Sequence, residues 1–316
     1  MTQGIIEKAA TDLDSFRQPT FFYGSAREGF LNALESLLDP TNQVVLLPAF
    51  IGWSPREGSG VFDPIEEIKA EPAFYELNRD LTVNLEWFEV AIAKIKPKIV
   101  VVIHYFGRTD PNIRKIGELA KRHGAILMED LAHGFFSSVG DSDAGRVGDF
   151  SIFSLHKMFP SREGGMVRYR LPQLVSGQKG TAANLAELIQ NYDWQSISAR
   201  RRSNFDAVLS ELHSIEAIET HVKFLWPKLN GGDVPQSLPV RLLTVDRDEI
   251  YHAMNADGFG MTSLYHTMIK DVQEGFPQMT ALSASIINFP VHQDMHPAQA
   301  KGMVRSFENA LSKSLS

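Results

Sequence analysis

The most informative run in this sequence is Ala125-Ile126-Leu127-Met128-Glu129-Asp130, in which four apolar residues lead directly into two acids. A short continuous apolar run is typical of a buried parallel strand. Similar runs stand before it at residues 44–47 and 98–103, and another follows at 149–155. The sequence therefore predicts a parallel sheet in which one of the strands ends in a pair of carboxylates.

Residues with helical spacing separate these runs. Apolar side chains recur every three or four positions in the segments 25–39, 85–95 and 113–120. Ser25 follows Tyr23-Gly24 and predicts a turn and the N-cap of the first helix. Strands and helices that alternate in this way predict a doubly wound α/β domain.

The pattern changes after Arg170, where a polar segment leads into a long helical pattern at 185–212. We expect a large domain of residues 1–190, followed by a small α+β domain of residues 191–316. The tail is expected to contain two strands and a terminal helix, at 240–245, 285–289 and 297–311.

Composition excludes several classes of protein. The 316 residues are 43% hydrophobic and 22% charged, which is typical of a globular chain, and the formal net charge of -7 argues against a nucleic-acid partner. Without cysteine the chain has no disulfide and no thiolate nucleophile. We expect no membrane span and no signal peptide, because apolar runs are short and charges interrupt residues 1–16. A cytoplasmic protein is the resulting expectation.

Polar residues at the ends of the predicted strands are candidates for chemistry, because ligands of open α/β sheets bind there. The Asp130 carboxylate, at the mouth of a buried strand, requires a cationic partner, and His133 follows three residues later. Lys157 follows the run 149–156, where a partly desolvated amine can form a Schiff base. The alternatives are a structural acid, a structural histidine and a solvated surface lysine.

Two further features fit a phosphorylated ring. The backbone N–H groups of Ser25, Ala26 and Arg27 stand at a predicted helix start, which favours an anion. Phe50 and Trp53 offer flat faces for stacking, although core packing is the alternative for either. An anion site, a stacking face, a carboxylate and an amine together suit pyridoxal 5'-phosphate (PLP).

Six motifs carry a family resemblance. They are His104-Tyr105-Phe106-Gly107, Met128-Glu129-Asp130-Leu131-Ala132-His133, the G-D…F-S run at 148–154, Lys157 with Glu163-Gly164-Gly165, Pro48-Ala49-Phe50, and Ile287-Asn288-Phe289-Pro290-Val291-His292. In these motifs the chain resembles the DegT/DnrJ/EryC1/StrS aminotransferases, a group of PLP enzymes that act mostly on nucleotide-linked keto-sugars. The resemblance implies the PLP-dependent transferase fold type I, which is aspartate-aminotransferase-like. It also implies a homodimer.

The resemblance also implies roles for individual residues. Lys157 is expected to be the Schiff-base lysine and general acid or base, and Asp130 the partner of the pyridine nitrogen. His133 is expected near the 3′-oxygen of the cofactor. The expected phosphate contacts are Ser154 and the amides of Ser25 and Ala26, and the stacking residue is Phe50 or Trp53.

The expected reaction moves an amino group from an amino acid, with glutamate as the expected donor, to a keto or aldehyde acceptor such as a nucleotide-linked keto-sugar. Dehydratase relatives carry histidine where this chain has Lys157, so transamination is favoured. Two departures are the shortened segment 153–157 and the lack of the family's G-Y-N-Y-R segment.

Alternatives to transamination are a PLP-dependent dehydratase or lyase, a non-catalytic PLP-binding protein, and a metal-dependent hydrolase. The hydrolase would use His104, Asp130, His133 and His156 as metal ligands. Arginines are candidates for holding a substrate carboxylate or diphosphate, namely Arg56, Arg162, Arg168 and Arg200 to Arg202.

Overall fold

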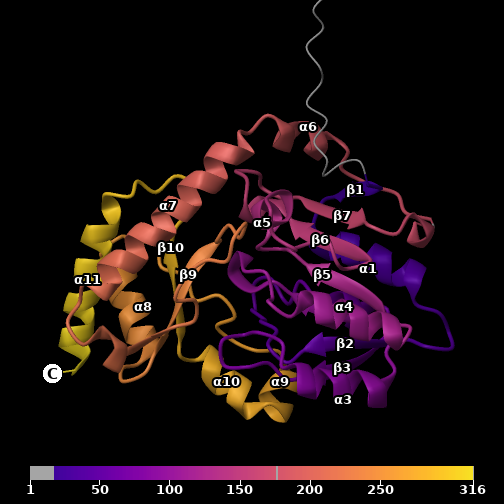
Figure 1. Cartoon of the computed structure of the whole chain (residues 1–316), viewed down its shortest axis with the longest axis horizontal. Helices are drawn as coiled ribbons and strands as arrows, with labels where there is room; N and C mark the ends of the chain where they lie inside the picture. Colours follow the sequence, from indigo (N-terminus) through magenta and orange to yellow (C-terminus); the bar gives the residue numbers. More distant parts are fainter. Residues whose placement is uncertain (1–17, 176, 316) are drawn as a thin grey trace, which may run out of the picture.

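The computed structural model describes residues 18–175 and 177–315. Its main sheet has seven strands in the order β1-β7-β6-β5-β4-β2-β3 (Figure 1). Strands β2 to β6 run parallel, whereas β7 and β1 run antiparallel along one edge. The bounds are β1 (Thr20–Tyr23), β2 (Val44–Pro48), β3 (Glu71–Tyr75), β4 (Ile99–Ile103), β5 (Ile126–Asp130), β6 (Phe150–Ser154) and β7 (Gly165–Tyr169).

All four strands expected from apolar runs are present, and they form β2, β4, β5 and β6. Three strands of this sheet were not predicted. The edge strand β3 contains Glu71 and Pro72, which interrupt any apolar run, and proline is tolerated at a sheet edge. The predicted mostly parallel α/β architecture is confirmed.

Helices cover the main sheet, and side-chain caps explain where two of them begin. The Ser25 Oγ accepts a hydrogen bond from the Glu28 N–H at 3.1 Å, so the first helix begins as predicted. Asn84 caps the third helix through the Trp87 N–H. The bounds are α1 (Ala26–Leu37), α2 (Asp63–Glu67), α3 (Leu85–Ile95), α4 (Ile113–Arg122), α5 (Phe135–Val139) and α6 (Asn184–Gln190).

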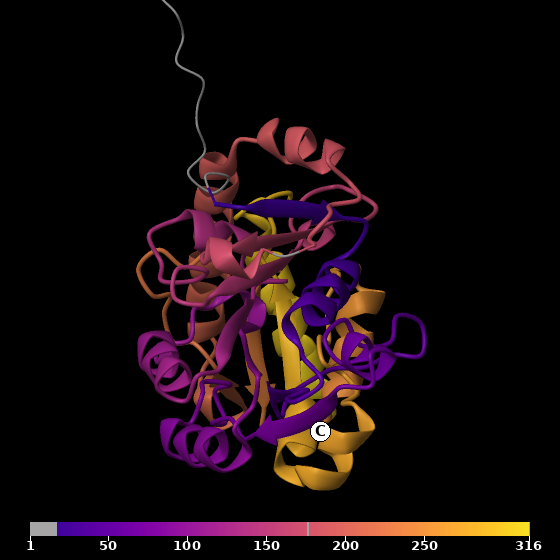
Figure 2. The ribbon, with the colours of Figure 1, turned by 90° about the vertical axis from the view of Figure 1, so that its right-hand side faces the viewer.

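The apolar side chains form two cores. The larger one joins the main sheet to α1, α3 and α4 and continues into the C-terminal part of the chain. The smaller one lies between β6, β7, α5 and α6 and includes Phe135, Phe153 and Leu185. Helix α6 lies above β1 in both views (Figures 1 and 2).

The C-terminal part contains an antiparallel sheet with the order β10-β9-β8. Helices α7 and α11 lie together beside this sheet, and α7 begins near the main sheet (Figure 1). The bounds are α7 (Trp194–His213), β8 (Val222–Phe224), β9 (Ser237–Leu242), α8 (Arg247–Ala256), α9 (Lys270–Gly275), α10 (Pro277–Ser283), β10 (Ile286–Pro290) and α11 (Gln299–Leu315). No helix within residues 18–175 and 177–315 has the length and hydropathy to cross a membrane.

The prediction of one long helix over 185–212 was wrong. The chain breaks between α6 and α7, and Asp193 starts the second helix by accepting a hydrogen bond from the Ser196 N–H at 3.0 Å. Aspartate caps a helix because its carboxylate satisfies a free N–H in the first turn. The cap allows α7 to begin in a new direction.

Gly165, the first residue of β7, allows α1 to approach the sheet closely. A Cβ atom on this residue would lie 2.2 Å from the carbonyl carbon of Ser25 and 2.4 Å from the Ala26 nitrogen. Both are backbone atoms, which cannot move aside as a flexible side chain can. The start of α1 is therefore held against the end of the sheet by a position that only glycine fits.

We expect Gly165→Ala to lower the free energy of unfolding by about 2 kcal/mol, because the added methyl overlaps the backbone at the start of α1. Urea denaturation measures this change. Gly302→Ala in α11 is the matched control, since no atom lies within 4 Å of its Cβ position and alanine favours helix. Equal stability of the two variants would contradict the close approach.

Candidate functional site

The carboxyl ends of β4, β5 and β6 bring the predicted catalytic residues together. Asp130 is the last residue of β5, and His104 directly follows β4. Lys157 lies in a short 3₁₀ turn, Leu155–Lys157, that follows Ser154 at the end of β6. These are three neighbouring parallel strands, so their ends meet at one edge of the sheet.

The amine of Lys157 lies beside His133, with 3.1 Å between Nζ and Nε2. Solvent reaches the lysine side chain, although protein atoms surround its amine. Burial of the amine lowers the pKa of Lys157, whereas the charges of Asp130 and Glu57 act in the opposite direction. A lowered pKa provides more of the neutral, nucleophilic amine near neutral pH.

Asp130 is buried, with 5% of its surface exposed, and its Oδ1 accepts a hydrogen bond from the Ala132 N–H at 2.8 Å. Burial raises the pKa of Asp130, while this hydrogen bond and the positive charge of Lys157 lower it. A buried carboxylate is costly unless a cation or a hydrogen-bond donor faces it. The site thus favours a positively charged or N–H-donating group beside Asp130.

His133 is held by the backbone of the turn that follows β4. The Phe106 N–H donates to the Nδ1 of His133 at 3.3 Å, so a neutral imidazole carries its proton on Nε2, which faces Lys157. The Phe106 ring lies parallel to the imidazole at a centroid distance of 6.1 Å. Burial and the charge of Lys157 both lower the pKa of His133, which keeps the ring neutral.

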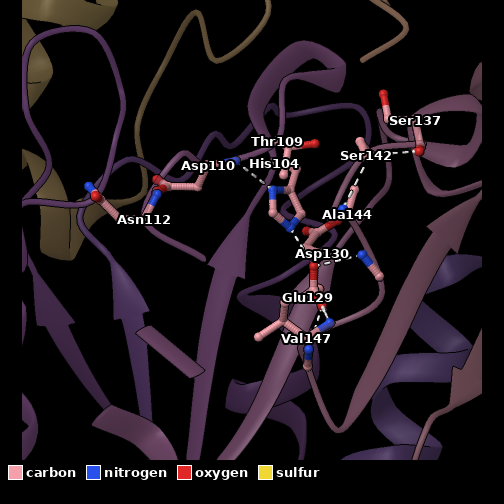
Figure 3. A network of polar contacts seen from close by, with 12 residues as sticks. His104, Thr109, Asp110, Asn112, Glu129, Asp130, Ser137, Ser142, Ala144 and Val147 are labelled. Atoms are coloured by element: carbon pink, nitrogen blue, oxygen red, sulfur yellow. Dashed lines mark hydrogen bonds and ion pairs between the residues drawn. The ribbon is translucent and has the colours of Figure 1, made fainter. Parts of the chain in front are cut away.

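Glu129 fixes the strand that delivers Asp130. Its Oε2 accepts from His104 Nε2 at 2.7 Å and from the Gly145 N–H at 2.7 Å, and its Oε1 accepts from the N–H groups of Val147 and Gly148. Figure 3 shows the His104 ring and this loop on either side of the carboxylate. Burial alone would raise the pKa of Glu129, but the hydrogen bonds from His104 and the backbone lower it.

Ser154 and the start of α1 lie at the same end of the sheet. Ser154 pairs with Gly165 in the β6–β7 register, and Gly165 packs against Ser25 and Ala26. The Ser25 hydroxyl caps α1, and the hydroxyl of Ser154 lies 3.4 Å from His156 Nδ1. The structure therefore brings the residues predicted to hold a phosphate into one region.

The two aromatic candidates differ in environment. Phe50 is fully buried and makes an edge contact with Tyr105 at 5.5 Å between centroids, whereas Trp53 is 44% exposed. Sequence reasoning missed Tyr265, which comes from the C-terminal part and contacts the rings of Phe50 and His133 at 5.3 and 5.9 Å. Nothing in the sequence around Tyr265 signals this position, because it depends on how a distant loop folds back.

Metal ligation has little geometric basis in this region. Among the residues that the structure describes, no three His, Asp or Glu side chains form a group able to hold a metal ion. His104 is engaged by Glu129 and by the Asp110 N–H, and His156 lies beside Ser154. The arrangement of these side chains therefore does not support the hydrolase hypothesis.

We expect Glu129→Gln to lower the free energy of unfolding by about 3 kcal/mol, because an amide NH₂ would face N–H donors that now meet a carboxylate. Because the pKa of Glu129 is lower in the folded protein than in the unfolded chain, where it is about 4.3, the ionised carboxylate stabilises the fold at any pH above this value. This stabilisation is lost as the pH falls from that value toward the pKa of Glu129 in the folded protein. Denaturation of both proteins at several pH values measures the effect. The exposed Glu118→Gln is the control, and an equal loss there would contradict this role.

The central part of the chain is similar to a known protein family. Residues 59–178 match the model of the DegT/DnrJ/EryC1/StrS aminotransferase family. The spore coat polysaccharide biosynthesis protein SpsC of Bacillus subtilis is 29% identical over 117 residues, which are 36% of this chain and 30% of SpsC. The match thus spans less than a third of SpsC. The family-model match at residues 59–178 includes Asp130 and Lys157.

Solved structures match nearly the whole chain. The Spr1654 protein of Streptococcus pneumoniae in its PLP-form has a TM-score of 0.73 at 16% identity, covering 96% of this chain and 89% of that one. PseC of Helicobacter pylori, an aminotransferase involved in pseudoaminic acid biosynthesis, has a TM-score of 0.72 at 14% identity, covering 93% and 87%. These matches establish the fold of PLP-dependent aminotransferases. Residues 59–178 are thus similar to the DegT/DnrJ/EryC1/StrS aminotransferase family, and nearly the whole chain has the fold of PLP-dependent aminotransferases.

Proposed function

We propose that the protein is a PLP-dependent aminotransferase. The observation that carries this proposal is the amine of Lys157, which lies 3.1 Å from His133 and within the electrostatic influence of the buried Asp130. An amine of lowered pKa beside a buried carboxylate is the pair that this chemistry requires. The match of residues 59–178 to the aminotransferase family model supports the same activity.

The residues fit the cofactor. Asp130 is a buried carboxylate in need of a donor, as the ring nitrogen of PLP would provide. Lys157 would hold the cofactor through Nζ, and His133 would lie near its 3′-oxygen. We propose Ser154 and the amides of Ser25 and Ala26 as the phosphate site, because Gly165 packs the start of α1 against the end of the sheet.

Phe50 and Trp53 both remain proposals for the stacking face. Phe50 lies within the aromatic group that includes Tyr105 and Tyr265, and this position favours it. Trp53 is exposed, so it could stack only on a ligand that extends to the protein surface.

When bound, PLP would supply a ring that withdraws electrons from the substrate carbon. Asp130 would keep a proton on the ring nitrogen, which maintains that withdrawal. The neutral amine of Lys157 would take the proton from the α-carbon of the amino donor and return one in the reverse half of the reaction. His133, neutral with its proton on Nε2, would orient the amine between these steps.

We propose glutamate as the donor and a nucleotide-linked keto-sugar as the acceptor. The names of SpsC and PseC place those two proteins in the biosynthesis of a polysaccharide and of pseudoaminic acid, which supports a carbohydrate acceptor here. A homodimer located in the cytoplasm, with a large domain of residues 1–190 and a small domain of 191–316, completes the proposal. Light scattering tests the dimer.

The alternatives within PLP chemistry are a dehydratase or lyase and a non-catalytic PLP-binding protein. Lysine at position 157 favours amino transfer, because an amine can both hold the cofactor and move the proton. Product analysis separates transfer from elimination, and a bound cofactor that never responds to any amino donor would indicate the non-catalytic protein.

We expect Lys157→Ala to remove the visible absorption of the lysine-linked cofactor and to lower the rate of amino transfer by about 10²- to 10⁴-fold, because the proton-transfer group is lost. Spectra before and after addition of L-glutamate measure both effects. The exposed Lys301→Ala is the control. A normal spectrum and normal turnover in Lys157→Ala would overturn the assignment.

We expect Asp130→Asn to lower the pKa of Lys157 further, because the Asp130 carboxylate raises this pKa. The Lys157 amine should then react with an amine-directed reagent at lower pH than in the unchanged protein. Peptide mass analysis of the cofactor-free protein at a series of pH values measures the shift. Labelling that moves to higher pH, or does not move, would contradict the electrostatic coupling of the two residues.

A further inference from the structure

A cavity of about 930 Å³ opens beside α5 and the first turns of α7. None of the residues proposed to hold PLP lines this cavity, so it is separate from the candidate active site. Its volume lies within the range of small-molecule sites, which is about 300 to 1,000 Å³. Trp194 and Phe136 provide aromatic parts of its wall.

Three arginines from different elements line the cavity: Arg146 follows α5, Arg168 lies in β7, and Arg202 lies in α7. Each donates to a backbone carbonyl, those of Gly140, Gly145 and Asp233. Within the described ranges, none of the three forms an ion pair with a carboxylate. Asp141 is the one acid among the lining residues, so the wall carries an excess of positive charge.

Arg168 is the buried member of this set. Only 5% of its surface is exposed, and its Nε has no hydrogen-bond partner. Burial lowers the pKa of Arg168 to about 10, and the charge of Arg146 acts in the same direction, whereas Glu129 raises it. The guanidinium is still charged at neutral pH.

The ring of Phe153, whose centroid lies 5.0 Å from the guanidinium carbon of Arg168, and the charge of Glu129 compensate part of the cost of burying this charge. An anion in the cavity would compensate the rest. Two guanidiniums close enough to depress one pKa, joined by a third on α7, favour a ligand with more than one negative charge. Guanidinium forks match the oxygens of a phosphate group.

We propose that this cavity binds a small molecule that carries a phosphate group, with Arg146, Arg168 and Arg202 as its anchors. The volume leaves room for more than free phosphate, so we expect a phosphorylated organic molecule or a diphosphate to bind more tightly than inorganic phosphate. The site would add a second ligand to the proposed enzyme, away from Lys157.

The test uses the full chain saturated with PLP, so that the proposed cofactor phosphate site is already filled. Trp194 lines the cavity, and its fluorescence reports binding at constant ionic strength. Inorganic phosphate, pyrophosphate and uridine diphosphate are the probes, and malonate is the carboxylate comparison. Trp194→Phe shows which part of the signal comes from the cavity.

We expect saturable binding of pyrophosphate or uridine diphosphate that is at least about tenfold tighter than that of phosphate or malonate. The double variant Arg146→Ala and Arg202→Ala should weaken it by about tenfold or more, since each charge-assisted contact is lost. Arg114→Ala is the control, because Arg114 is exposed, pairs with Asp143 and lies outside the cavity.

Three results would overturn the proposal: unchanged affinity in the double variant, an equal loss in Arg114→Ala, or no probe that binds more tightly than phosphate and malonate. Arg168→Met provides an independent check through thermal unfolding. The unchanged protein should be stabilised by pyrophosphate, whereas this variant should not be. If the variant does not fold, the double variant still decides the question, because Arg146 is exposed and Arg202 is only half-buried.

Discussion

Glu129 lies at the end of β5 with its carboxylate closed off from solvent, and four donors meet its two oxygens. Three of those donors are backbone N–H groups of the loop that leads into β6, and the fourth is His104 after β4. The Glu129 carboxylate therefore links three neighbouring strands, β4, β5 and β6. The position of Asp130 depends on this arrangement, because it is the next residue along the same strand.

Contacts between the C-terminal part and the main sheet complete the site. The Gln236 N–H donates to the Phe106 carbonyl at 2.7 Å, and the Trp53 N–H donates to the Thr267 carbonyl at 2.8 Å. Both bonds are made by the backbone of loops that follow strands of the main sheet. Tyr265 enters the aromatic group through the second of these contacts. The site is thus built from loops that are far apart in the sequence.

Much of the main sheet could be predicted, because β2, β4, β5 and β6 are buried on both faces and are therefore short continuous apolar runs in the sequence. Asp130, His133 and Lys157 could be located because each follows such a run at a short distance. Tyr265 could not be found, since its position depends on the docking of a loop. The break before α7 was also missed, because Asp193 acts as a cap in a segment whose apolar spacing continues on both sides.

The cavity lined by the three arginines could not be predicted from the sequence, for a related reason. Arg168 and Arg202 were among several candidate arginines, and their spacing along the chain does not indicate which of them share a wall. Their proximity arises because β7 runs antiparallel beside β6 while α7 begins next to α5. Only the folded structure shows which arginines form ion pairs with acids, as Arg114 does, and which donate to backbone carbonyls, as Arg168 does.

The hydrogen bond from the Phe106 N–H to His133 disfavours the charged form of Lys157. Because Nδ1 accepts from the backbone, the imidazole presents an N–H toward Lys157, and an ammonium group there would place two donors against each other. A neutral amine can accept that N–H. Phe106, which carries this amide, has a left-handed backbone conformation with a φ of 56°. The orientation of a single peptide group thereby favours the form of the lysine that can react.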